Sequence, residues 1–281
     1  MGNIFYAPGA QRAERVKALF ARIASRYDLI NDLQSFGLHR YWKARVLKIG
    51  SPAPGQRALD ICCGTADISL ALAKRGVSVV GLDFCAQMLN VARARKAKLR
   101  TLNPGVDSET SLTQPQPHGV NGWNSRAANL GSLAFVRADA LQVPFPDNTF
   151  DIVSVGYGLR NLADWAIGLR EMQRVARPGG RLLVLDFGKP DNRIWRGLYF
   201  GYLRLFVPWL GRVFCGDANA YAYILESLKY YPAQRGVAEK MREMRLSNVR
   251  VINLLGGIMS INYAEKQGSI NSGVPALGKS E

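Results

Sequence analysis

Short runs of apolar residues alternate along this chain with longer segments in which apolar side chains recur at helical spacing. Such short, uninterrupted runs are typical of strands buried on both faces of a parallel sheet and joined by helices. The runs lie at 58–62, 78–82, 133–137, 152–156 and 181–186, followed by a pair at 248–254 and 258–264 around two glycines. We therefore expect an α/β fold with about seven strands, mostly parallel, closed by an antiparallel terminal hairpin.

The segments before and between these runs predict helices and domain boundaries. Residues 10–49 carry apolar positions at helical spacing and precede a turn-rich joint at 51–55, so we expect 1–50 to form an N-terminal helical lid on a domain spanning 51–281. A solvated helical face without a lid function is the plainer alternative. Residues 101–132 are poor in apolar residues and rich in Pro, Gly, Ser, Thr, Asn and Gln, which predicts a flexible surface insertion.

One stretch joins the first two expected strands through a glycine turn. Gly64 stands where the first strand must turn into a helix, and Asp83 ends the second strand nineteen residues later, close to the ~20-residue spacing of nucleotide-binding βαβ units. A residue without Cβ lets a ligand approach the backbone, and a carboxylate accepts hydrogen bonds from two ribose hydroxyls. The loop has one glycine and lacks the G-x-G-x-x-G pattern of dinucleotide sites. It resembles instead the first motif of class I S-adenosylmethionine-dependent methyltransferases, with a dinucleotide enzyme and an unliganded α/β domain as the alternatives.

Other polar residues follow strand ends at the same predicted edge, where ligands bind in open parallel sheets. Asp139 comes just after the third strand, and its carboxylate is able to accept a hydrogen bond from an adenine amino group; a helix N-cap is its alternative role. Arg160 and Asn161 follow the fourth strand, beyond Gly156 and Gly158. Their side chains supply donors that can hold an oxygen anion.

The formal net charge of +16 predicts attraction to polyanions, either nucleic acid or an anionic membrane. The basic residues are spread rather than grouped with base-stacking aromatic residues, so we expect no nucleic acid partner. The four cysteines have no metal-ligand spacing and there are two histidines, so we expect no metal site. The N-terminus lacks the apolar core of a signal peptide, and no apolar run reaches about eighteen residues, which favours a cytoplasmic protein.

The segment 193–214 favours the membrane over nucleic acid. It contains four arginines, seven aromatic residues and no acidic residue, with aromatic and aliphatic positions near helical spacing. Aromatic side chains combined with cations suit a helix that lies in the interface of an anionic membrane. A cap buried over the sheet and a homodimer interface are the two alternatives for this segment.

Several motifs, in order along the chain, resemble those of the ubiquinone/menaquinone biosynthesis C-methyltransferase family. The stretches Tyr27–Lys43 and Arg174–Phe187 resemble the two signatures of that family. Shorter matches lie at 59–65, 141–147, 158–161 and 221–232. The resemblance runs from about Tyr6 to Lys266 and is interrupted by the expected insertion.

The resemblance implies a Rossmann-like sheet of the class I methyltransferase type, with S-adenosylmethionine as co-substrate and no metal. The residues expected to bind this co-substrate are Asp60, Gly64, Thr65, Asp83, Asp139, Ala140 and Gly156. The chain departs from the family pattern at Ala66, Gly156, Asp186 and Gly188, where the family often has Gly, Ser, Glu and Ser. We expect these departures to tune affinity rather than abolish binding.

The implied reaction moves a methyl group to a ring carbon of a polyprenylated quinol, with demethylmenaquinol as the expected substrate and menaquinol as the product. An aromatic carbon is a weak nucleophile, so the quinol must lose a hydroxyl proton and the resulting phenolate must be stabilised. We expect Arg160 to hold the oxyanion, Asn161 to orient it or a bridging water, and His39 or Asp28 to assist proton removal.

A lipid substrate and the segment 193–214 together predict a cytoplasmic protein associated with the inner face of the membrane. Two other functions remain open at this point. One is a methyltransferase that acts on another small molecule or on RNA, for which the net charge is the only argument. The other is a non-enzymatic binding protein on the same fold, which the retained Asp60, Gly64, Asp83 and Arg160 argue against.

Overall fold

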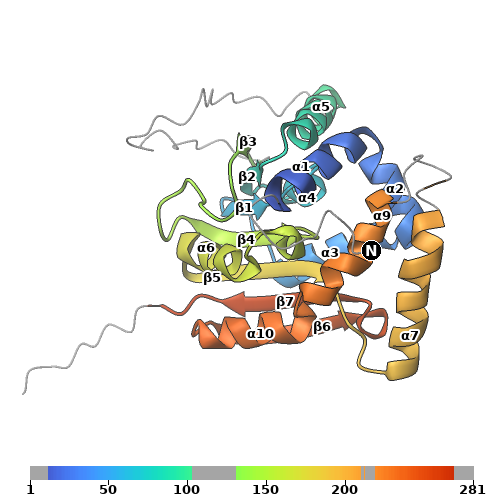
Figure 1. The fold of residues 1–281 in the computed structure, drawn as a ribbon. Helices are drawn as coiled ribbons and strands as arrows, with labels where there is room; N and C mark the ends of the chain where they lie inside the picture. Colours follow the sequence, from blue (N-terminus) through green and yellow to red (C-terminus); the bar gives the residue numbers. More distant parts are fainter. Residues whose placement is uncertain (1–11, 103–130, 210–211, 213–218, 269–281) are drawn as a thin grey trace, which may run out of the picture.

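The computed structural model describes residues 12–102, 131–209, 212 and 219–268. Within these residues a seven-stranded sheet has the order β3-β2-β1-β4-β5-β7-β6 (Figure 1). The strands are β1 (Arg57–Ile61), β2 (Ser78–Asp83), β3 (Leu133–Arg137), β4 (Phe150–Gly156), β5 (Ala176–Phe187), β6 (Ser247–Leu254) and β7 (Met259–Glu265). Strands β1 to β5 pair in parallel, and β7 pairs antiparallel with β5 and β6. The predicted sheet and its terminal hairpin are therefore confirmed.

The fifth strand begins earlier than its apolar run predicts. Ala176 pairs with Phe150 and Arg181 pairs with Ile152, so residues 177–180 lie opposite a single residue of β4. The Arg-Pro-Gly-Gly sequence of 177–180 is thus a bulge inside β5 rather than a turn before it. Gly179 has φ +74°, a conformation that glycine adopts without strain.

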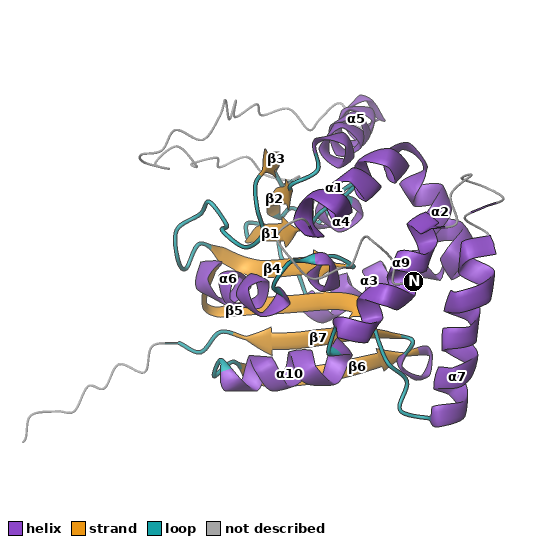
Figure 2. Cartoon of the chain, viewed as in Figure 1, coloured by secondary structure: helices purple, strands orange, loops and turns teal. Residues whose placement is uncertain are grey.

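Apolar residues on both faces of the strands form two cores. Leu182 and Val184 pack in one core, whereas Leu183 and Leu185 pack in the other. Figure 2 shows the sheet as a middle layer with helices on each side. The face with Leu183 is covered by α3 (Leu38–Gly50) and α4 (Asp67–Ala73), and the opposite face by α6 (Trp165–Val175) and α10 (Ala233–Glu243). This two-sided burial explains why the strand runs show no polar alternation.

The remaining helices are α1 (Arg12–Ile23), η2 (Ala24–Arg26), α2 (Tyr27–Ser35), α5 (Ala86–Leu102), η3 (Leu159–Asn161), α7 (Arg193–Gly201), the π-helical η4 (Tyr202–Phe206), α9 (Asn219–Tyr230) and η5 (Leu255–Gly257). Several of them lie at the carboxyl ends of the parallel strands, whereas α5 packs on β2 and β3. Figure 1 places α2, α7 and α9 beyond these strand ends. The Tyr202 hydroxyl donates to the Gln34 carbonyl oxygen at 2.8 Å, which joins the N-terminal helices to the segment after α7.

The segment that begins at Arg193 is both a cap and an exposed apolar surface. Tyr199, Leu203 and Val207, each four residues apart, are buried against the core. Ile194 and Leu205 instead expose 77% and 73% of their surface. The buried face agrees with the predicted cap, and the interfacial helix stays a prediction. Residues 210–211 and 213–214 lie outside the described part.

Most of the expected insertion at 101–132 lies outside the described residues, since α5 ends at Leu102 and β3 begins at Leu133. No helix among the described residues combines the length and the apolar composition needed to cross a membrane. The same residues contain no group of three His, Cys, Asp or Glu side chains placed to hold a metal ion.

Candidate active site

A first cavity, of about 210 Å³, lies at the carboxyl ends of β1, β2 and β4. Its wall includes five of the residues predicted to bind the co-substrate, namely Gly64, Asp83, Asp139, Ala140 and Gly156. Asp60 and Thr65 line a small adjoining hollow together with Gly64 and Gly156. The residues predicted to bind the co-substrate therefore lie at one edge of the sheet, as expected for residues that follow the ends of parallel strands.

The glycine loop is held by the carboxylate that ends β2. Asp83 Oδ2 accepts a hydrogen bond from the Gly64 backbone N–H at 2.9 Å, and Asp83 Oδ1 accepts one from Cys85 at 2.9 Å. Burial raises the pKa of Asp83, while these backbone donors oppose the shift. Each carboxylate oxygen accepts more than one hydrogen bond, so Asp83 is also able to bind ribose hydroxyls in the cavity.

Close packing explains why glycines follow β4. A Cβ added to Gly156 would lie 2.8 Å from Ile68 Cδ1, and one added to Gly158 would lie 2.4 Å from Cys62 Cβ. A side chain at Gly156 would require the end of the Ile68 side chain on α4 to move, whereas one at Gly158 would collide with Cys62 next to the backbone. Cavity, carboxylate and glycines together fit a bound nucleoside.

Asp60 lies beneath the loop and faces two serines. Its carboxylate accepts hydrogen bonds from the Ser69 hydroxyl at 2.6 Å and the Ser154 hydroxyl at 2.8 Å. Burial raises the pKa of Asp60 to about 6. Asp60 thus connects β1 to α4 and β4 and supports the loop from below, rather than lining the larger cavity.

Asp139 is exposed and accepts a hydrogen bond from the Leu141 backbone N–H at 2.8 Å, within a turn. The alternative role as a helix N-cap is therefore wrong, because no helix begins there.

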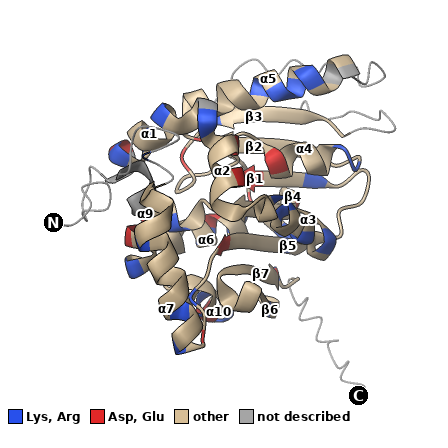
Figure 3. Ribbon diagram, turned by 90° about the vertical axis from the view of Figure 1, so that its right-hand side faces the viewer, with Lys and Arg blue, Asp and Glu red and all other residues tan. Residues whose placement is uncertain are grey.

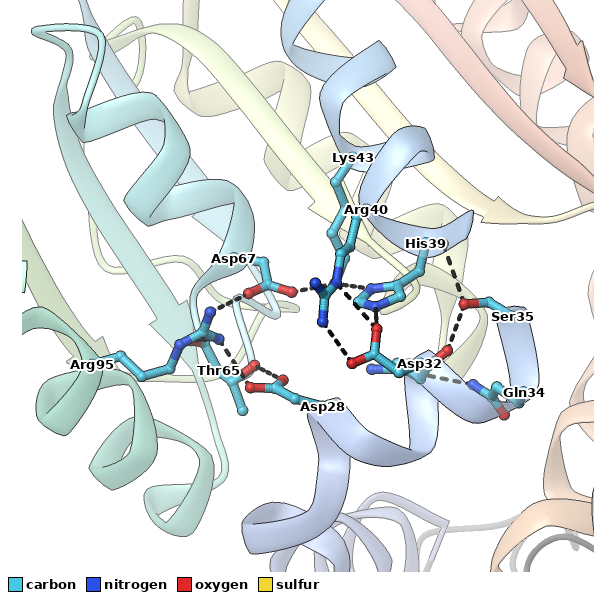
Figure 4. A network of polar contacts seen from close by, with 11 residues as sticks. Asp28, Asp32, Gln34, Ser35, His39, Arg40, Lys43, Thr65, Asp67 and Arg95 are labelled. Atoms are coloured by element: carbon cyan, nitrogen blue, oxygen red, sulfur yellow. Dashed lines mark hydrogen bonds and ion pairs between the residues drawn. The ribbon is translucent and has the colours of Figure 1, made fainter. Parts of the chain in front are cut away.

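A chain of charged groups connects the N-terminal helices to the glycine loop (Figure 4). The Thr65 hydroxyl donates to Asp28 at 2.8 Å, and Arg95 of α5 pairs with Asp28 at 3.2 Å and with Asp67 at 2.6 Å. Lys43 of α3 pairs with the second oxygen of Asp67. Asp28 therefore lies beside the glycine loop. It does not line the second cavity, described below, so its position does not fit the expected role in proton removal.

The second cavity, of about 290 Å³, lies between α2, α3, α7 and the ends of β4 and β5. It is lined mainly by apolar and aromatic side chains. They include Phe36, Leu38, Trp42, Phe187, Trp195, Leu198 and Met259. His39 and Arg160 add polar groups to its wall, and Asn161 does not. An apolar cavity with few polar groups is typical of a site for a hydrophobic small molecule.

His39 is held on both ring nitrogens. Lys43 Nζ lies 3.1 Å from Nδ1, and Asp32 Oδ1 lies 2.8 Å from Nε2. Because the ammonium group is a donor only, the network assigns the lone pair to Nδ1 and the proton to Nε2. Burial and the charge of Lys43 lower the pKa of His39, which keeps the ring neutral. Both nitrogens thus have partners in the structure, and the predicted role in proton removal has no free acceptor here.

Arg160 is a buried cation at the wall of the apolar cavity. Its Nη1 donates to Asp186 Oδ1 at 2.7 Å and to the Tyr157 carbonyl oxygen at 2.6 Å, and Nε donates to Ser227 at 3.2 Å. The guanidinium lies 4.6 Å from the centre of the Phe187 ring. The structure therefore adds a positioning function, since this arginine ties β5 and α9 to the turn after β4.

Asn161 faces the other cavity. Its side-chain amide donates to the Tyr157 carbonyl oxygen at 3.1 Å. The residue lines the first cavity, where the co-substrate is expected to bind and which we call the co-substrate cavity. Arg160 and Asn161, expected to act together on one oxygen, thus lie on different sides of the same turn.

Two residues of this site were not predicted from the sequence. Asp186 is the penultimate residue of β5, at the predicted ligand edge, so the rule that selected Asp83 also selects it. Tyr157 lies between two glycines, but a tyrosine among apolar residues gave no signal of its own.

Comparisons with known proteins agree with this geometry. The model of the ubiE/COQ5 methyltransferase family matches residues 9–104 and 122–266. The chain belongs to this family. Its relatives include a ubiquinone/menaquinone biosynthesis C-methyltransferase UbiE of Cellvibrio japonicus, 35% identical over 262 residues that cover 92% of this chain and 94% of the relative. The UbiE of Ectopseudomonas mendocina is 36% identical over 266 residues, covering 92% of this chain and 91% of the relative.

Solved structures support the same fold. A putative S-adenosyl-L-methionine-dependent methyltransferase of Methanococcus maripaludis superposes with a TM-score of 0.57 at 18% identity, covering 89% of this chain and 94% of that one. A SAM-dependent methyltransferase of Aquifex aeolicus gives a TM-score of 0.51 at 17% identity, covering 90% and 97%. This member of the ubiE/COQ5 family is an S-adenosylmethionine-dependent C-methyltransferase with the class I fold.

Proposed function

We propose that this enzyme methylates a ring carbon of a polyprenylated quinol, with demethylmenaquinol as the substrate. The observation that carries the proposal is the apolar cavity, which meets the co-substrate cavity at Tyr27 and Tyr157. The UbiE relatives are named for ubiquinone and menaquinone biosynthesis, which agrees with an aromatic, lipid-soluble acceptor. The aromatic wall supplied by Trp42, Tyr157 and Phe187 suits a flat ring system.

S-adenosylmethionine supplies an electrophilic methyl group when it is bound in the co-substrate cavity. The chain holds it through Asp83, Asp139 and the backbone near Gly64 and Gly156, and Thr65 and Asp60 support that loop. A quinol hydroxyl releases its proton to solvent, and charge moves to the neighbouring ring carbon. The new carbon–carbon bond forms as the methyl–sulfur bond breaks, and the electron pair of the broken bond stays on sulfur. The ring carbon then loses its own proton to solvent, which restores the aromatic ring.

The chain's own residues act mainly by electrostatics and by orientation. Arg160 lies at the wall of the acceptor cavity, where its guanidinium, although paired with Asp186, favours the ionised form of the quinol. Asn161 acts from the co-substrate side on the turn that carries Tyr157. His39, neutral and fixed by Lys43 and Asp32, contributes the shape of the cavity. The helices within 12–50 close the site as a lid.

The rim of the acceptor cavity fits a lipid tail. Phe36, Leu198 and Leu255 line the cavity and expose 72%, 62% and 50% of their surface, so the opening has an apolar border. The exposed face of α7 continues this border with Ile194 and carries Arg193. Figure 3 shows basic residues along α7. We take an anionic membrane, rather than a second copy of the chain, as the occupant of this surface.

The test is methyl transfer from labelled S-adenosylmethionine to demethylmenaquinol in anionic vesicles under strong reductant. We expect label in the lipid fraction, and no label when the quinone is left oxidised, because only the quinol can ionise. A demethylated benzoquinol serves as the second acceptor and decides the ring preference. Co-substrate binding without transfer to either quinol would contradict the proposal.

A further inference from the structure

Tyr157 is held in an unusual backbone conformation by its neighbours. Its φ is +61°, in the left-handed region that a bulky residue rarely adopts. Its backbone N–H donates to the Leu185 carbonyl oxygen at 2.7 Å, and its own carbonyl oxygen accepts from Arg160 and Asn161. Three contacts from β5 and η3 thus impose this conformation, which directs the side chain between the two cavities.

The hydroxyl group of Tyr157 has no hydrogen-bond partner among the described residues, although it is buried. A buried hydroxyl without a partner typically costs about 1–3 kcal/mol. The ring itself is well packed, with its centre 5.8 Å from that of Phe187 and 5.6 Å from Lys43 Nζ. The structure therefore fixes the ring firmly and leaves its polar atom unsatisfied.

The position of Tyr157 indicates a role for its hydroxyl group. Of the described residues, Tyr27 and Tyr157 alone line both the co-substrate cavity and the acceptor cavity. Methyl transfer must take place where these cavities meet, since the accepting carbon has to reach the methyl group. Tyr157 therefore lies beside the place where the acceptor ring reacts.

We propose that the Tyr157 hydroxyl donates a hydrogen bond to the quinol oxygen adjacent to the carbon that accepts the methyl group. This inference rests on the proposed function and names a residue that acts on its substrate. The bond strengthens as the oxygen becomes anionic, so it stabilises the quinolate and the transition state more than the neutral quinol. Tyr157 keeps its own proton throughout and acts as a donor, not as a base.

The surroundings of Tyr157 favour this role. Burial raises the pKa of its hydroxyl far above the ordinary value, so the group stays protonated at physiological pH. The titratable and charged groups that face it come from five elements: Tyr27 of α2, Lys43 of α3, Asp67 of α4, Arg160 of η3 and Asp186 of β5. Asp67 is paired with Lys43, and Asp186 with Arg160.

The first experiment measures the ionisation of a bound quinol without turnover. Menaquinol analogues that already carry the ring methyl group are titrated by ultraviolet absorbance, anaerobically, on the full-length protein saturated with S-adenosylhomocysteine. We compare the wild type with Tyr157→Phe, which removes one oxygen atom and keeps the ring. Removal of one donor to a developing oxyanion costs about 10²-fold, which corresponds to a rise of about two units in the pKa of the bound quinol.

The matched control is Tyr263→Phe. Tyr263 is also a buried tyrosine, but its hydroxyl bonds to Glu265 on β7 and it lines neither cavity. We expect the quinol pKa in this variant to equal that of the wild type. Thermal unfolding is recorded for both variants, and Tyr157→Phe should not be less stable, because the group it lacks had no partner.

Turnover gives the second readout. In Tyr157→Phe, kcat near neutral pH should fall about 10²-fold and recover as the pH rises through the higher quinol pKa, with unchanged affinity for S-adenosylmethionine. An unchanged quinol pKa or an unchanged pH profile would overturn the inference, as would a loss of kcat that is equal at every pH. If the wild type itself neither binds nor methylates a quinol, the proposed function fails, which differs from a failure of the variant alone.

Discussion

At the scale of single residues, the effect of burial on an ionisable side chain depends on the groups that it contacts. Asp60 is buried against two serine hydroxyls, and its pKa rises to about 6. Arg160 is buried equally deeply but faces the carboxylate of Asp186 at 2.7 Å. The first group favours its neutral form in the folded protein, and the second depends on its anionic partner.

The first prediction concerns the pH dependence of stability. Since the folded pKa of Asp60, about 6, lies above the ordinary 3.8, the folded state binds this proton more tightly than the unfolded state. Its contribution is complete below the lower value and is lost as the pH rises through the higher one. We expect the unfolding free energy of the wild type, relative to Asp60→Asn, to fall by about 2 kcal/mol between pH 4 and 7. Urea unfolding at several pH values measures this difference, and a constant value would contradict it.

The second prediction concerns Arg160. Arg160→Ala leaves Asp186 buried without its cation, so we expect a loss of about 3–5 kcal/mol in the free energy of unfolding. The control is Arg235→Ala, because Arg235 pairs with Asp191 on the surface, where such pairs contribute less than about 1 kcal/mol. Equal unfolding midpoints in urea for the two variants would show that the pair with Asp186 is not structural.

At the scale of elements, the site depends on contacts between helices far apart in the sequence. Asp28 of α2 meets Thr65 of the glycine loop and Arg95 of α5. The same network continues through Asp67 to Lys43 of α3. These contacts join the N-terminal helices to the glycine loop, so the proposed lid and the proposed co-substrate site are connected.

The third prediction tests this connection. Asp28→Ala removes the acceptor of the Thr65 hydroxyl and one partner of Arg95, a loss of about 1–2 kcal/mol. We expect amide hydrogen exchange in α2 to become about tenfold faster, while exchange in α10, which packs on β5, β6 and β7, is unchanged. Mass spectrometry of peptic fragments measures both helices in one sample. Equal protection of α2 in the wild type and the variant would show that the N-terminal helices are held by their apolar contacts alone.

At the scale of the whole molecule, a high positive charge is combined with exposed apolar residues near α7. The net charge is +16, and Figure 3 shows basic residues on α1, α5, α7 and α9. Ile194, Leu198, Leu205 and Trp209 are exposed on or near α7. The proposed contact with anionic lipid would combine electrostatic attraction with burial of apolar surface, and salt screens only the electrostatic part.

The fourth prediction separates these terms. Ile194 and Leu205 are highly exposed and do not line the acceptor cavity. We therefore expect Ile194→Ser with Leu205→Ser to weaken binding to anionic vesicles more than tenfold, while turnover of a short-chain quinol in detergent is unchanged. Binding of the wild type to the vesicles should weaken when salt is added and when neutral lipid replaces the anionic lipid. Unchanged vesicle binding together with an altered mass in size-exclusion chromatography would show that a second copy of the chain occupies this surface.

Local pattern was sufficient to predict much of the site. Uninterrupted apolar runs marked the strands because the sheet is buried on both faces, and the ends of parallel strands necessarily meet at one edge. Asp83, Asp139 and Gly156 could therefore be placed together without knowledge of the fold, and the structure puts them in one cavity. Asp60 follows the same rule but points beneath the loop, because alternate residues of a strand face opposite sides.

The sequence by itself determined the α/β architecture, the glycine turn and the carboxylate edge, since each depends on neighbouring residues and on the period of the backbone. Only the tertiary structure decided which cavity each side chain faces. Arg160 and Asn161 are adjacent in sequence yet line different cavities. Asp28 reaches Thr65, and Arg160 reaches Ser227, across 37 and 67 positions of the chain. The left-handed turn at Tyr157 exists because β5 and η3 hold it, and contacts between distant segments leave no periodic trace in a sequence.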